Sequence, residues 1–63
     1  MKATIFLTYS DDSEVCFNFQ SDESEEHALA TLLMVCRGTL MGSSATFVTA
    51  YNEEGFEYCK YMK

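Results

Sequence analysis

One stretch, residues 21–41 (SDESEEHALATLLMVCRGTLM), constrains the fold most, because it alone carries a sustained helical pattern. Its apolar residues recur at steps of one, three and four, which on a 3.6-residue repeat places them on one face. They are Ala28, Leu29, Leu32, Leu33, Cys36 and Leu40. The stretch is therefore predicted to be an amphipathic helix that packs this face against the rest of the chain.

The residues at its two ends predict where this helix begins and ends. Asp22 or Ser21 is expected to be the N-cap, and Glu25 stands three residues after Asp22, the spacing of a capping box. Gly38 is a natural C-terminal stop. Residues 39–41 form either an extra turn or the start of a loop.

A β-hairpin is predicted on each side of the helix. Alternating side chains with β-branched and aromatic content predict strands over residues 2–9, 14–19, 45–51 and 56–62. Residues 10–13 and 52–55 are turns, the second with Gly55 where a positive φ is expected. In the third strand either Phe47 or Val48 faces the helix, and the pattern leaves both assignments open.

The order β-β-α-β-β predicts an α+β two-layer sandwich over a single domain, residues 1–63, with a four-stranded antiparallel sheet and the helix on one face. One helix cannot cover four strands, so apolar side chains around Phe6 are expected on the opposite face. Such a patch usually marks an interface, and edge strands without proline offer a second route to pairing. We therefore expect self-association through Phe6 as one option, with monomer and homodimer both open.

The charge balance limits the partners this chain can have. Ten acids against four bases leave a net charge of −6 at pH 7, which disfavours direct binding to nucleic acid or to an anionic membrane. No run approaches the length of a membrane span, and the N-terminus lacks the apolar core of a signal peptide. We expect a cytoplasmic protein whose partner is a larger protein or complex with a basic surface.

Chain direction predicts that most of the acids gather at one end. If every element reverses direction, the start of the helix and the turn at residues 52–55 share an end of the molecule. That end would hold seven of the ten acids: Asp22, Glu23, Glu25, Glu26, Glu53, Glu54 and Glu57. Acidic helix starts and turns also serve helix stability and solubility alone. The sharper interpretation is a recognition surface whose carboxylates stand in for phosphates in a basic groove.

Cysteine and histidine spacing gives no sign of a metal or catalytic site. The three cysteines are dispersed, which suits reduced thiols, although a Cys16–Cys59 bridge stays open if their strands are neighbours. His27 and Cys36 stand nine residues apart on the helix, or about 13.5 Å, too far to ligate one ion. No glycine-rich phosphate loop occurs. We expect no enzyme activity, no metal and no cofactor.

Two functions remain from these observations. The first is a small acidic protein-binding module, and this general character resembles the accessory proteins that phages and prophages encode against host enzymes or defence complexes. It would inhibit a nucleic-acid-handling factor by mimicking nucleic acid. The alternative is a self-associating structural or adaptor protein that uses the exposed sheet face, without such mimicry.

Overall fold

A computed structural model describes all residues, 1–63, and shows an α+β fold with the element order ββαββ. The strands are β1 (Lys2–Thr8), β2 (Glu14–Gln20), β3 (Phe47–Asn52) and β4 (Glu57–Met62), and the helix is α1 (Glu25–Met41). All strand pairs are antiparallel, in the order β2-β1-β3-β4. The two-layer sandwich expected from the sequence is confirmed.

The helix begins later than predicted, and its N-cap is Ser24 rather than Asp22 or Ser21. Ser21 is still held in extended conformation, because its N–H donates to the Met1 carbonyl and its carbonyl accepts from the Met1 nitrogen. The chain changes direction over the next residues, and the Ser24 hydroxyl then accepts a hydrogen bond from the His27 N–H. The β-ladder therefore delays the start of the helix.

The helix does not stop at Gly38 but continues to Met41, with Gly42 as C-cap. Leu40 is 3% exposed and belongs to the core, so the last turn is held in place by packing. A glycine within a helix costs only about 1 kcal/mol relative to alanine, less than burial of a leucine side chain contributes. Residues 39–41 are thus an extra turn.

The structure settles which side of β3 faces the helix. Val48 and Ala50 are fully buried with Ile5 and Leu7 of β1, whereas Phe47 lies on the opposite face of the sheet. The helix contributes its own buried side chains to this core: Ala28, Leu32, Cys36 and Leu40.

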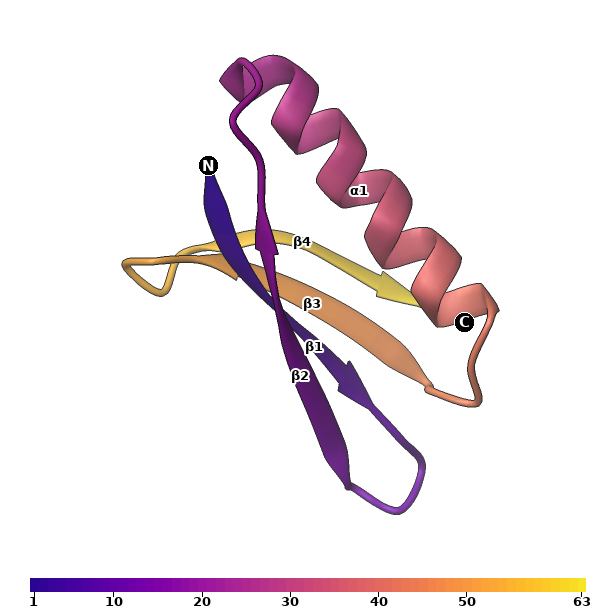
Figure 1. Ribbon diagram of the computed structural model, residues 1–63. Helices are drawn as coiled ribbons and strands as arrows, with labels where there is room; N and C mark the ends of the chain where they lie inside the picture. The colour runs from indigo at the N-terminus through magenta and orange to yellow at the C-terminus, as the bar shows by residue number, and fades with distance from the viewer.

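The helix covers only part of the sheet. It packs on β3 and β4, while the β1–β2 hairpin extends past it, as Figure 1 shows. Because β2 and β4 are opposite edges of the sheet, Cys16 and Cys59 cannot form the disulfide that the sequence left open. The helix also lacks the length and apolar content that crossing a membrane requires.

The position of the N-cap gives a direct test of the helix start. Ser24→Ala removes the side-chain acceptor for the His27 N–H and should lower the free energy of unfolding by about 1 kcal/mol. Asp22→Ala is the matched control, and its effect should stay within about 0.5 kcal/mol. Urea denaturation followed by circular dichroism measures both. A larger loss in Asp22→Ala would place the cap where the sequence suggested.

Candidate functional site

Carboxylates from two distant segments of the chain surround one depression at an end of the molecule. It has a volume of about 430 Å³ and is lined by Met1, Lys2, Glu23, Glu25, Asn52, Glu53, Glu54 and Tyr58. The helix start and the β3–β4 turn therefore do lie at the same end. We call this depression, with its four glutamates, the acidic depression.

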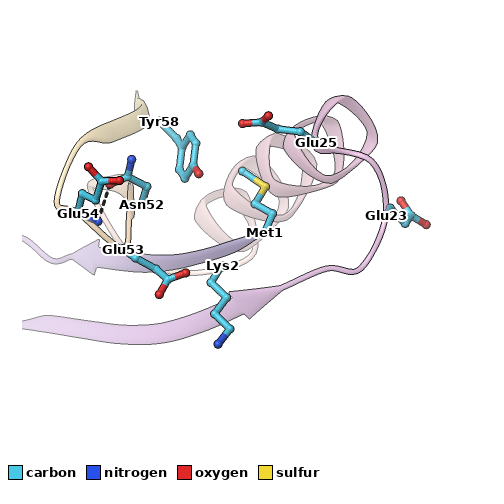
Figure 2. A pocket seen from close by; sticks show the side chains of 8 residues that line it. All are labelled: Met1, Lys2, Glu23, Glu25, Asn52, Glu53, Glu54 and Tyr58. Atoms are coloured by element: carbon cyan, nitrogen blue, oxygen red, sulfur yellow. Dashed lines mark hydrogen bonds between the residues drawn. The ribbon is translucent and has the colours of Figure 1, made fainter.

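Each glutamate has its own orientation in the acidic depression. In Figure 2 the Glu25 side chain extends from the helix toward the ring of Tyr58, and Glu53 lies beside Lys2. Glu23 comes from the loop before the helix and points away from the centre. Glu25 thus extends into the hollow from the helix, Glu53 lies with Lys2 on the other side of β1, and Glu23 belongs to the rim.

The β3–β4 turn is held rigidly by Asn52. Its side-chain oxygen accepts from the N–H groups of Glu54 and Phe56, each at 2.9 Å. Its backbone N–H donates to the Phe56 carbonyl at 2.8 Å. Gly55 has φ 91°, the positive value that the sequence predicted and that L side chains adopt only at a cost. This turn presents Glu53 and Glu54 from a fixed backbone.

The other predicted acids lie outside the acidic depression. Asp22 and Glu26 are exposed beside the helix start, and Glu57 is the exposed first residue of β4. They flank the acidic depression without lining it.

Sequence reasoning overlooked Lys2 and Tyr58, which line the acidic depression. The direction argument that placed the acids also places the start of the first strand at this end, so Lys2 could have been found the same way. Tyr58 could not, because a bulge between Ala50 and Tyr51 shifts the β3–β4 register. Lys2 puts one cation among the glutamates, and Tyr58 adds an aromatic wall.

The three basic side chains other than Lys2 lie outside the acidic depression. The Arg37 guanidinium lies 4.7 Å from the centre of the Tyr61 ring, and the Lys60 ammonium lies 4.9 Å from that of Phe47. The Lys63 ammonium donates to the Ser43 carbonyl. Each of these cations is held against a group on its own side of the molecule, so the charge is polarised along the sheet.

The β1–β2 turn holds a further acid in the same region as these cations. Hydrogen bonds from the Ser13 hydroxyl and N–H to Asp11 lower the pKa of the Asp11 carboxyl. Asp11 is thus fixed within its own turn.

The face of the sheet away from the helix is a second surface, which we call the open face. Phe6 meets Tyr51 edge-to-face, with ring centres 5.7 Å apart. A hollow of about 420 Å³ on this face is lined by Phe6, Thr8, Glu14, Phe47, Thr49, Tyr51 and Lys60. Phe6 thus lies where the sequence placed it, among aromatic neighbours on a face that no helix covers.

Two cysteines meet between the helix and the sheet. Burial, with Cys59 nearby, raises the pKa of the Cys36 thiol to about 12. Burial also raises the pKa of Cys59. Both groups stay protonated at neutral pH, and protonated thiols are poor nucleophiles and poor metal ligands. No three histidine, cysteine or acidic side chains are grouped so as to hold a metal ion.

Comparison of the chain with protein-family models, with curated proteins and with solved structures found no match.

The turn at Asn52 should be the element that fixes the acidic depression. Asn52→Ala removes the acceptor of two hydrogen bonds and should lower the free energy of unfolding by about 1–3 kcal/mol. Asn18→Ala is the matched control on an exposed strand position and should change it by less than about 0.5 kcal/mol. Thermal and urea denaturation measure both variants. Equal losses would show that Asn52 has no special role in the turn.

Proposed function

We propose that this protein is a non-enzymatic protein-binding module that uses its acidic depression to dock on a basic surface of a larger, nucleic-acid-handling protein. In this proposal it is an inhibitor of the phage or prophage type that acts in the cytoplasm without a cofactor. Its carboxylates take the places that phosphates of nucleic acid would occupy on the partner.

One observation carries the proposal: glutamates from the helix start and from the β3–β4 turn line the same depression. Charges within a Debye length, about 8–10 Å at physiological salt, reinforce one another. A cluster fixed on two rigid elements therefore creates a stronger local field than the same charges on a flexible tail. Such a field speeds association with an oppositely charged partner.

The lining of the acidic depression suits arginine or lysine side chains. Six of its eight lining residues are polar or charged, and glutamate carboxylates accept paired hydrogen bonds from guanidinium. The Tyr58 ring supplies a face over which a cation can lie, worth about 0.5–1 kcal/mol at an exposed site. Proteins that hold nucleic acid present arginine and lysine in this way.

Charge neutralisation at the acidic depression tests this proposal. A triple variant (Glu25→Gln, Glu53→Gln, Glu54→Gln) should lose at least about tenfold in affinity for the partner, since close charge pairs at interfaces couple strongly. The partner is first captured from a bacterial lysate on immobilised protein, then titrated by surface plasmon resonance. Duplex DNA and added salt should both displace it.

A matched variant controls for net charge alone. Asp11→Asn, Asp12→Asn and Glu14→Gln remove three acids at the other end and leave the same net charge as the test variant. This control should bind the partner as the unmodified protein does. If both triple variants weaken binding equally, overall charge and not the acidic depression governs it. Unchanged binding in the first variant would refute the electrostatic proposal.

A second candidate is a self-associating adaptor that uses the open face. The half-buried aromatic pair of Phe6 and Tyr51, on a face that no helix covers, favours it, because aromatic side chains are enriched at the centres of interfaces. Phe6→Asp should then convert a dimer to a monomer in sedimentation velocity. Thr4 is a half-buried β1 neighbour outside the hollow of the open face, so Thr4→Asp should weaken the dimer less. A dimer of unchanged mass in Phe6→Asp would count against this candidate.

A further inference from the structure

We propose that two copies of this chain pair through the free edge of β2, antiparallel and about a two-fold axis at Phe17, to form one continuous eight-stranded sheet. The proposal is independent of the function of the acidic depression. None of the residues that line that depression belongs to β2, so it stays open in the dimer.

The hydrogen-bond pattern shows which groups of β2 are free. Met1 and Ser21 exchange two hydrogen bonds, and the Tyr9 N–H donates to the Ser13 carbonyl. In an antiparallel ladder such pairs alternate with pairs that direct their N–H and C=O groups outward. The register from Lys2↔Gln20 to Thr8↔Glu14 then assigns the outward groups to Glu14, Cys16, Asn18 and Gln20.

The two edges of the sheet differ in how they are protected against pairing. Edge strands are normally blocked by lysine, proline, a bulge or a covering helix. β4 carries Lys60, pairs with β3 through a bulge between Ala50 and Tyr51, and lies under the helix. β2 has seven residues, EVCFNFQ, with no lysine or proline, regular pairing throughout and no helix over it. It is thus a long edge ready to accept another strand.

The sequence of β2 is complementary to itself in one full-length register. Because Phe17 is the middle residue of Glu14–Gln20, pairing about Phe17 uses every outward group of both copies. Glu14, the one charged residue of the strand, then meets the neutral Gln20 of the second copy. Cys16 meets Asn18 in the same way. No like charges face each other within the paired strands, which would otherwise destabilise them.

The same register covers apolar side chains that the helix leaves exposed. Val15 is 50% exposed, and Phe17 and Phe19 are half-buried, on the helix side of β2. Their pairs across the seam are the close, non-hydrogen-bonded kind, with Cα atoms about 4.5 Å apart. Phe17 thus packs against its own copy and Val15 against Phe19, and aromatic pairs of this kind stabilise sheets.

Net charge predicts the salt dependence of this dimer. Each chain carries −6, so the two copies repel each other. Added salt screens this repulsion, so dimerisation should become tighter with salt. Binding of a basic partner at the acidic depression would instead become weaker, which separates the two interactions.

Substitution of one outward N–H tests the pairing. Asn18→Pro removes the outward backbone N–H of residue 18 from both copies and leaves the hydrogen bonds between β2 and β1 in place. It should raise the dimer dissociation constant roughly tenfold or more. Asn18→Ser keeps the N–H and should dimerise as the unmodified chain does. Sedimentation velocity over a range of concentrations and salt measures this, with circular dichroism to confirm folding.

Cross-linking tests the register without relying on a proline variant. In Asn18→Cys the introduced residue faces Cys16 of the second copy as a hydrogen-bonded pair. The Cα atoms of such a pair are about 5.5 Å apart, within the Cα–Cα range of disulfides. Diamide, which accepts the two electrons and two protons, should convert this variant to a covalent dimer. Peptide mass spectrometry should find the bond between positions 16 and 18. The unmodified chain should cross-link little, because its two Cys16 residues are out of register.

Two results would overturn the proposal. One is a monomer at all concentrations and salt, together with no cross-link in Asn18→Cys. The other is a dimer that Phe6→Asp dissociates and folded Asn18→Pro does not, because that result would place the contact on the open face.

Discussion

The contact between the apolar side of α1 and the strands β3 and β4 is the interaction on which the rest of the structure depends. Leu32 and Cys36 are fully buried against Val48 and Ala50. Full burial of a side chain such as Leu32 contributes about 1.5–3 kcal/mol, a large share of the stability available to a chain this small. This contact also fixes the position of the helix start relative to the β3–β4 turn, so it brings the glutamates of both segments together.

The same contact explains why two surfaces remain uncovered. A single helix lies over one half of the sheet, so the helix side of β2 and the whole open face have no second layer. The molecule measures 36 × 22 × 14 Å, and its thinness reflects this arrangement. The charge, in contrast, is gathered at an end of the sheet, where it does not compete with either apolar surface. The proposed binding of a basic partner and the proposed pairing with a second copy therefore do not exclude each other.

Much of the fold was predictable because period and direction are properties of the sequence itself. The alternation in β1 and the four-residue spacing of Leu32, Cys36 and Leu40 identify the elements, and their reversals bring Glu25 and Glu53 to one end. The N-cap was predicted wrongly because a hydrogen bond between Met1 and Ser21, distant in sequence, keeps the chain extended. The facing of Val48 and the position of Tyr58 depend on tertiary packing and on a bulge, neither of which leaves a local signal.

The two chain ends lie at opposite poles of the molecule, with a practical consequence for anyone who fuses a tag to this protein. Met1 lines the acidic depression, whereas Lys63 donates its backbone N–H to Thr46 near the far end of the helix. Residues appended before Met1 would crowd the glutamates and add a mobile chain across them. A fusion after Lys63 leaves that region open to solvent, so immobilisation belongs at the carboxyl terminus.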